Sequence, residues 1–253
     1  MRLGRIKMII ESTSFLEASF MPLQDQFLQL LSSPNEVNVL LAFEMAKGMP
    51  EIDFKQYLAD YLLLWQCFFD KNLKKIDHTH VISLNRPTIE IRSRRIEFLP
   101  SEIRRLQNLE NLTLFDNQLK AFPQEIGALK NLKDLNFLSN QVTELPAEIG
   151  LLSNLEVLSG SLNELQYLPE EINRLVNLRV LNFPYNRLTS LPKSIARLTK
   201  LQELNLPRNE LTHLPEEMRH FSNLSYINLK NNPISNQEKQ KIVEWFPKTR
   251  IEF

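Results

Sequence analysis

The chain has little cysteine, little glycine and no long apolar run. One of its 253 residues is a cysteine, Cys67, which excludes an internal disulfide framework. Five glycines are too few to argue for a glycine-rich loop that holds phosphate. No stretch approaches the roughly 18 apolar residues of a membrane span, and Met8-Ile9-Ile10 is too short for a signal-peptide apolar region. We therefore expect a cytoplasmic protein, with secretion that uses no cleaved signal peptide as the alternative.

The chain also lacks an excess of charge of either sign. Its 30 basic and 30 acidic residues balance, which argues against a general affinity for nucleic acid or for an anionic membrane. Six arginines cluster before residue 106, but Glu90, Glu97 and Glu102 are interleaved with them. A solvated, salt-bridged face is therefore favoured over a phosphate-binding edge. The six are Arg86, Arg92, Arg94, Arg95, Arg104 and Arg105.

What the chain does have is a repeat. A Leu-Pro or Phe-Pro pair returns six times at a step of 23 residues, which indicates a stack of similar supersecondary units, a solenoid. Within one unit, Leu135 and Phe137 are two residues apart and point to the same face of an extended segment. Ile149, Leu152 and Leu155 follow at intervals of three, which suits a 3₁₀ turn. The pairs begin at Leu99, Phe122, Leu145, Leu168, Leu191 and Leu214.

The full pattern of one unit resembles the leucine-rich-repeat family. The resemblance is to the bacterial form with a 23-residue unit, LPxxIxxLxxLxxLxLxxNxLxx, familiar from spirochaete proteins, and it covers about residues 87–253. It implies an α/β solenoid, a right-handed horseshoe with a parallel β-sheet on its concave side. The pattern is clearest at Leu132, Leu135, Phe137, Asn140, Val142, Leu145, Pro146, Ile149, Leu152 and Asn154.

An asparagine follows the predicted strand in six units. We interpret this amide column as buried side chains that satisfy backbone groups where the chain turns, the family's usual arrangement, and not as ligand groups. Its members are Asn117, Asn140, Asn163, Asn186, Asn209 and Asn232. A second column precedes the strands, and because asparagine tolerates left-handed dihedral angles it also suggests turn chemistry. It consists of Asn108, Asn131, Asn154, Asn177 and Asn223.

One unit departs from the pattern at Gly160. Leucine or phenylalanine stands at this position in the other full units, so glycine would leave a hole in the core. The adjacent units both carry phenylalanine there, Phe137 and Phe183. We predict that these two rings lean into the space and conserve the packed volume.

The first 86 residues follow a helical pattern instead. Ser33-Pro34-Asn35-Glu36 is typical of a capping box, and Gly48 followed by Pro50 would end that helix. Asp53 is expected to cap a longer helix with an apolar stripe, and a shorter helix is expected around residues 23–31.

These patterns divide the chain into three parts. We expect an N-terminal α-helical capping domain at 1–86, leucine-rich repeats at 87–234 and a C-terminal cap at 235–253. Residues 87–99 form a degenerate first coil in which Arg94 replaces the asparagine of the amide column. A helix near 237–245 and a final strand at 250–253 would cover the last coil.

The outward positions of the predicted sheet carry many apolar side chains. Exposed apolar patches often mark partner sites, although scattered apolar groups without a role are a competing interpretation. We expect a monomeric, non-enzymatic module that binds a protein partner through its concave face. The alternative is a secreted bacterial effector that interacts with host proteins. The candidate residues are Phe115, Leu138, Val157, Leu162, Val180, Tyr185, Arg208 and Tyr226.

Signals for catalysis are weak. His78-Thr79-His80 has no third metal ligand nearby, so a solvated linker near a strand start is favoured. Cys67 lies in an apolar helical stripe and is interpreted as a small core residue. Some bacterial leucine-rich-repeat effectors carry a separate ubiquitin-ligase domain with a catalytic cysteine, for which this chain has no room. We predict no catalytic residue, no metal site and no cofactor.

Overall fold

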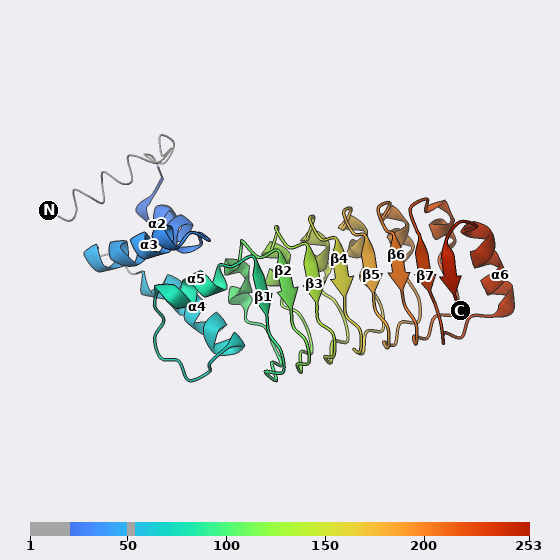
Figure 1. Ribbon diagram of the computed structural model, residues 1–253, viewed down its shortest axis with the longest axis horizontal. Coiled ribbons are helices and arrows are strands. Elements are labelled where there is room, and N and C mark those ends of the chain that lie inside the picture. The colour runs from blue at the N-terminus through green and yellow to red at the C-terminus, as the bar shows by residue number, and fades with distance from the viewer. Residues whose placement is uncertain (1–20, 50–53) are drawn as a thin grey trace.

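The computed structural model describes residues 21–49 and 54–253. Within these residues, four α-helices precede the repeats: α2 (Leu23–Leu31), α3 (Glu36–Gly48), α4 (Lys55–Phe68) and α5 (His78–Leu84). Figure 1 shows them gathered at one end of a long row of strands. The expected signals at Pro50 and Asp53 lie outside the described residues. The predicted short helix is confirmed as α2.

The cap of α3 is Asn35, and the expectation that Ser33 caps this helix is wrong. Asn35 Oδ1 accepts a hydrogen bond from the N–H of Val37 at 2.8 Å, while Ser33 Oγ accepts one from the N–H of Asn35 at 3.1 Å. Asparagine is as strong a cap as serine. The helix therefore begins after the later of the two candidate residues.

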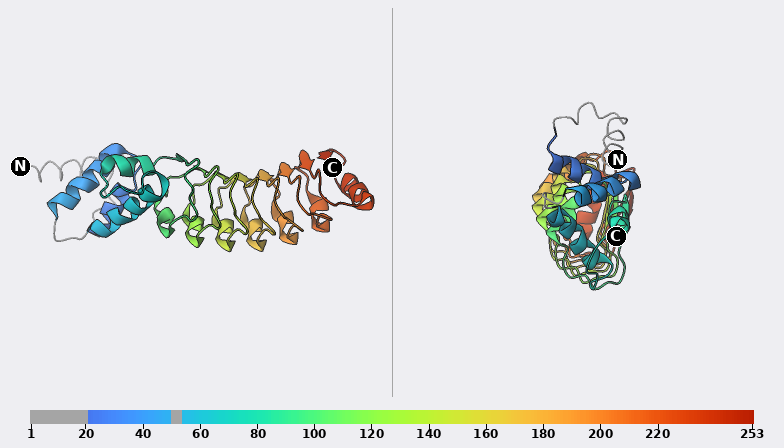
Figure 2. Two further views of the ribbon diagram at one scale, coloured as in Figure 1. Left: turned by 90° about the horizontal axis from the view of Figure 1, so that it is seen from below. Right: turned by 90° about the vertical axis from the view of Figure 1, so that its left-hand side faces the viewer.

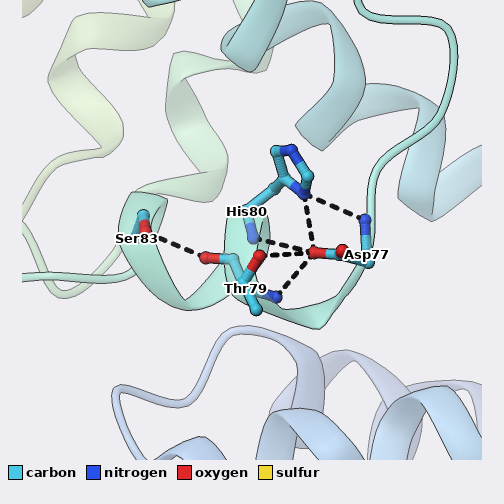
Figure 3. A network of polar contacts seen from close by, with 4 residues as sticks. All are labelled: Asp77, Thr79, His80 and Ser83. Carbon is cyan, nitrogen blue, oxygen red and sulfur yellow. Dashed lines mark hydrogen bonds and ion pairs between the residues drawn. The ribbon is translucent and has the colours of Figure 1, made fainter.

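The segment His78-Thr79-His80 forms the first turn of α5, so the expected linker is wrong. Asp77 is the cap, and its Oδ1 accepts hydrogen bonds from the N–H of Thr79 at 2.9 Å and of His80 at 3.3 Å. The ring of His80 reaches back to the N–H of Asp77, which closes a capping box (Figure 3). These contacts give His80 a structural role at the helix start.

Eight parallel strands form one sheet in the order of the sequence, as predicted (Figure 1). Each strand is three residues long, and from β1 to β7 paired residues are 23 positions apart, so that Leu112 lies beside Leu135 and Leu135 beside Leu158. The pairing of β1 with β2 confirms the degenerate first coil. The strands are β1 (Thr88–Glu90), β2 (Asn111–Thr113), β3 (Asp134–Asn136), β4 (Val157–Ser159), β5 (Val180–Asn182), β6 (Glu203–Asn205), β7 (Tyr226–Asn228) and β8 (Arg250–Glu252).

A 3₁₀ helix follows each strand from β1 to β6, as the three-residue spacing predicts. A proline precedes each of these helices, where its missing N–H and fixed φ cost nothing. Figure 2 shows them in a row on the side of the coils opposite the strands. They are η2 (Ser101–Arg105), η3 (Gln124–Ala128), η4 (Ala147–Leu151), η5 (Glu170–Arg174), η6 (Lys193–Arg197) and η7 (Glu216–His220).

The core runs between the strands and the 3₁₀ helices. Leu135, Phe137, Ile149 and Leu152 are fully buried, as their spacing predicts, and equivalent residues of the neighbouring coils pack against them. Because one coil has too few apolar residues to enclose its own core, stacking provides most of the stability. Burial of each large apolar side chain contributes roughly 1.5 to 3 kcal/mol before chain entropy is subtracted.

The rings of Phe137 and Phe183 fill the space beside Gly160, which confirms the prediction. Their centroids are 6.1 Å apart, and both side chains are fully buried. Leu162, a nearby leucine of the same coil, does not fill this space, since it points outward and is 49% exposed. Phe137 and Phe183, from the coils on either side of Gly160, therefore fill the volume that a leucine side chain would occupy at this position.

The amide column joins consecutive coils through backbone groups. Asn163 Nδ2 donates to the carbonyl oxygens of Phe137 at 3.0 Å and Gly160 at 3.1 Å, and its Oδ1 accepts from the N–H of Val142 at 2.9 Å. The other five members make equivalent contacts, and Asn232 is more exposed than the rest. The side chains of this column are thus occupied within the fold.

The second asparagine column does not adopt left-handed dihedral angles, so that part of the expectation is wrong. Its side chains instead bond to the preceding coil: Asn131 Nδ2 donates to Gln107 O at 2.7 Å, and Asn154 Nδ2 donates to Lys130 O at 2.8 Å. The left-handed residues lie just after the strands, one position before the amide column. From coil to coil they are Ser93, Asp116, Ser139, Leu162, Tyr185, Arg208 and Asn231, and Arg95 in the first coil is a further residue with positive φ.

The end of the chain adds a helix and the last strand. Helix α6 (Asn236–Trp245) is capped by Ser235, whose Oγ accepts from the N–H of Glu238 at 3.2 Å. The chain then returns to place β8 beside β7, where Ile227 pairs with Ile251. The helix and the final strand expected in this region are both present.

Candidate partner-binding surface

The outward side chains of the sheet form a surface that we call the strand face. Side chains alternate along a strand, so each coil contributes outward residues at fixed positions, and the constant register aligns them in columns across the sheet. In the coil that contains β3, Asp134, Asn136 and Leu138 each belong to a different column. A fourth column consists of the residues with positive φ that precede the amide column, and we call it the left-handed column.

The structure places all eight predicted binding residues on this surface. Phe115, Leu138, Val157, Val180 and Tyr226 are half-buried, whereas Leu162, Tyr185 and Arg208 are exposed. The last three occupy the same column of three adjacent coils. The apolar groups are therefore close together on one side of the molecule.

In the left-handed column, the residues of the middle coils differ in type from those of the outer coils. Leu162 has φ 55° and Tyr185 has φ 54°, although bulky L-residues rarely adopt positive φ. Asp116, Ser139 and Asn231, which occupy the outer coils, are small and polar and suit this conformation better. Sequence reasoning missed this strain because it assigned left-handed angles to the other asparagine column.

Three aromatic rings of the strand face lie under guanidinium groups. Arg208 lies 5.0 Å from the ring centroid of Tyr185, and Arg250 lies 5.5 Å from that of Tyr226. Arg92 lies 5.7 Å from the ring centroid of Phe115. Such contacts are attractive and hold long side chains in place. Arg208 and Tyr185 thus present one combined cationic and aromatic group.

Two carboxylates of the strand face, those of Asp134 and Glu203, were not among the predicted binding residues. In the described residues, neither accepts a hydrogen bond or forms an ion pair. Burial raises the pKa of the Asp134 carboxyl, because its charged form loses hydration that no partner replaces. The binding residues were predicted from the sequence mainly by their apolar character, so these two acidic positions were not included.

A row of polar side chains crosses the middle of the strand face. Asn205 Nδ2 donates to Asn182 Oδ1 at 2.7 Å, and Asn182 Nδ2 donates to Ser159 Oγ at 3.4 Å. This direction leaves Asn205 Oδ1 buried without a hydrogen-bond partner. Buried polar atoms in native proteins are nearly always paired. The last acceptor of this row, Asn205 Oδ1, therefore has no hydrogen-bond donor.

Other candidate sites have structural partners. Burial raises the pKa of the Cys67 thiol to about 11, so it is a poor nucleophile near neutral pH, and its Sγ contacts the carbonyl oxygen of Phe98 at 3.7 Å. Among the interleaved charges before residue 106, Arg92 pairs with Glu90 and Arg105 with Asp60.

Across residues 21–49 and 54–253, no cluster of His, Cys, Asp or Glu could hold a metal ion. In the same residues, no helix is long and apolar enough to cross a bilayer.

Solved structures with similar coils include those of two plant receptors. The leucine-rich-repeat ectodomain of the Arabidopsis thaliana receptor kinase GASSHO1/SCHENGEN3, in complex with CASPARIAN STRIP INTEGRITY FACTOR 2, is 28% identical over 62% of this chain and 20% of its own, with a TM-score of 0.55. The plant peptide hormone receptor RGFR1 in complex with RGF2 is 30% identical over 60% of this chain and 25% of its own, with a TM-score of 0.53.

A family model described as leucine rich repeat matches residues 176–234. The coils within this range are therefore leucine-rich repeats. A leucine-rich-repeat protein of Leptospira interrogans is 32% identical over 70% of this chain and 56% of its own, with a TM-score of 0.44. The chain thus spans little more than half of that protein and a quarter or less of each plant receptor chain. No curated protein matches the chain.

Proposed function

We propose that this leucine-rich-repeat protein is a non-enzymatic module that binds a protein partner on its strand face, the concave side in the expected horseshoe. The observation that carries the proposal is the placement of Leu162 and Tyr185, which are 49% and 48% exposed in left-handed backbone conformations. Each strained residue costs of order 1–3 kcal/mol. Its exposed apolar surface gains nothing until a partner covers it.

The neighbouring groups support the same proposal. Tyrosine and arginine are among the residue types that most often contribute binding energy at protein interfaces, and Tyr185 and Arg208 lie together. Val157 and Val180 extend the apolar area along the sheet. The two plant receptors with similar coils are described in complexes with CASPARIAN STRIP INTEGRITY FACTOR 2 and RGF2, which favours a protein or peptide ligand for this chain.

The test uses a variant that removes the exposed apolar groups and relieves the strain. Leu162→Asn with Tyr185→Asn places asparagine, which tolerates left-handed angles, at both positions. We expect this variant to melt at or above the wild-type temperature and to capture its partner from a cell lysate at least about tenfold less well, a loss of 1.4 kcal/mol. Quantitative mass spectrometry of the captured proteins measures the loss.

A matched control replaces exposed apolar residues elsewhere. Tyr167 and Val176 are 50% and 52% exposed and lie outside the strand-face columns. The variant with Tyr167→Asn and Val176→Asn should capture the same proteins as the wild type. If the strand-face variant also captures an unchanged set of proteins, the proposed function is wrong.

We also propose that the helices before residue 87 and the segment 235–253 cap the repeats at 87–234. The side chain of Arg105 in η2 pairs with Asp60 of α4 at 2.7 Å, and Asn108 donates to the carbonyl oxygen of Ser32. At the other end, β8 covers the edge of β7. End coils without such cover expose their apolar flank. Deletion of 235–253 should therefore cause aggregation in size-exclusion chromatography, and a stable monomer would contradict this.

A further inference from the structure

Asp134 and Glu203 lie in one column of the strand face, separated by two valines. The strand register places Asp134 beside Val157, Val157 beside Val180 and Val180 beside Glu203. Neighbouring parallel strands are about 4.8 Å apart, so three steps separate the two acidic positions by about 14 Å. The column thus has an acidic group at each end of a short apolar row.

The other acidic side chains of the strand face have partners. Glu90 pairs with Arg92, and Asp116 accepts a hydrogen bond from Ser93 Oγ at 2.6 Å. Glu252 pairs with Lys230 at 2.8 Å and with Arg250. Arg208 has no ion pair among the described residues, but it is held over Tyr185 at the opposite edge of the face.

The two unpaired acidic groups have different surroundings. Asp134 is half-buried, so its carboxylate loses part of its hydration in the free chain and gains no hydrogen bond in return. Glu203 is exposed, but it shares its face of β6 with Asn205, whose buried Oδ1 has no partner. Both ends of the column therefore offer acceptor oxygens without donors. A partner with two positive groups would satisfy them.

We propose that Asp134, Val157, Val180 and Glu203 recognise an extended partner segment with the pattern basic–x–apolar–x–basic. An extended chain rises about 3.4 Å per residue, so about 14 Å corresponds to four residues. Residues i, i+2 and i+4 of such a segment face the same side. The basic side chains then meet the two carboxylates, and the middle apolar side chain lies over the two valines.

The end at Glu203 is suited to a lysine. An ammonium group has three N–H donors, and the exposed carboxylate of Glu203 supplies two acceptor oxygens for them. This inference rests on the proposed function, because it specifies the chemistry of the partner that the strand face binds.

The first experiment selects binders from a displayed library of random 12-residue peptides on the immobilised full chain. We expect enrichment of basic residues four positions apart with an apolar residue midway between them. The same selection on the variant with Asp134→Asn and Glu203→Gln should lose this pattern. On the variant with Asp134→Lys and Glu203→Lys it should enrich acidic residues at the same spacing, which loss of folding cannot produce.

The second experiment measures affinity by fluorescence anisotropy with a labelled peptide containing the sequence KTLTK. We expect the variant with Asp134→Asn and Glu203→Gln to bind this peptide about tenfold more weakly than the wild type. A peptide containing KTLK, with three-residue spacing, should also bind the wild type more weakly. Thermal melting shows that the variant is folded, and its melting temperature should not fall, since both changes remove unpaired charges.

The outcomes separate this inference from the proposed function. Selected peptides without the basic pattern, no selected peptide at all, or equal affinity of wild type and neutral variant would each overturn the charge pairing. In that case, weaker binding of the selected peptides or of the lysate partner to the variant with Leu162→Asn and Tyr185→Asn than to the wild type would still support the strand face as the binding surface. Binding that neither set of substitutions changes would overturn both.

Discussion

The Cβ atom that Gly160 lacks would lie 2.3 Å from Cζ of Phe137. It would also lie 2.8 Å from Cε1 of Phe183, so rings from both neighbouring coils enclose this glycine. Gly160→Leu restores the residue type of the repeat pattern, yet it inserts a side chain where there is no room. We expect it to lower the free energy of unfolding by about 1–3 kcal/mol, measured by urea denaturation.

The packing around Gly160 also predicts a coupling between two substitutions. Phe137→Leu alone leaves a cavity and should cost roughly 1–2 kcal/mol. Together with Gly160→Leu it gives both coils the usual side chain, so the double variant should lose less stability than the two single losses combined. Additive losses in this double-mutant cycle would show that Phe137 does not fill the space for Gly160.

Asn163→Ala is expected to destabilise the middle of the solenoid by about 1–3 kcal/mol, because it leaves the buried N–H of Val142 unpaired and removes one of the two amide donors to each of the carbonyl oxygens of Phe137 and Gly160. Asn232→Ala provides the control. Asn232 makes equivalent contacts with the carbonyl oxygens of Leu206 and Leu229, but it is more exposed, so water can replace its amide. Chemical denaturation should show the smaller loss at Asn232, and an equal loss would argue against burial as the cause.

Asp134→Asn is expected to stabilise the protein at neutral pH. Burial raises the pKa of Asp134 in the folded state above its ordinary value, so ionisation favours the unfolded chain at pH values above the folded-state pKa. Below the ordinary aspartate pKa of about 4 the carboxyl is protonated in both states, and the stability difference between the wild type and the variant that comes from ionisation should vanish. Melting temperatures of wild type and variant at pH 7.5 and pH 3 measure it. A wild type that is more stable at pH 7.5 would show that Asp134 has a stabilising partner.

Asp77→Ala is expected to destabilise α5 by about 0.5–2 kcal/mol, because the cap of that helix is lost. Asp77→Asn should cost much less, since asparagine accepts the same backbone hydrogen bonds. Hydrogen bonds from Thr79 and His80 lower the pKa of Asp77, so its contribution is complete above the ordinary aspartate pKa. It should decline as the pH falls toward the lowered value. Hydrogen exchange at the amides of α5 measures both effects, and unchanged exchange would contradict the capping role (Figure 3).

The 23-residue period was enough to predict most of the fold. It predicted the strand at Leu135, the 3₁₀ turn after Pro146 and the packing of Phe137 beside Gly160, because each coil repeats the same local geometry. The seven-residue helix α5 was missed, since it is too short to show an apolar period and its capping box uses His80 in place of glutamate.

The candidate surface was only partly predictable. Sequence spacing identified the outward positions, including Leu162 and Tyr185, because alternation along a strand needs no tertiary information. The left-handed angles of these two residues depend on how the chain leaves each strand, and the asparagine columns suggested a different place for them. The lack of a partner for Asp134 and Glu203 depends on side chains from several coils and cannot be read from one repeat.

The constant register implies that recognition by this sheet changes in discrete steps. Insertion or deletion of one 23-residue coil between β3 and β6 would move the two acidic positions apart or together by about 4.8 Å, while each coil kept its own packing. That increment is between one and two residues of an extended ligand. Duplication or loss of whole coils would therefore shift the preferred ligand sequence without the need for a new fold.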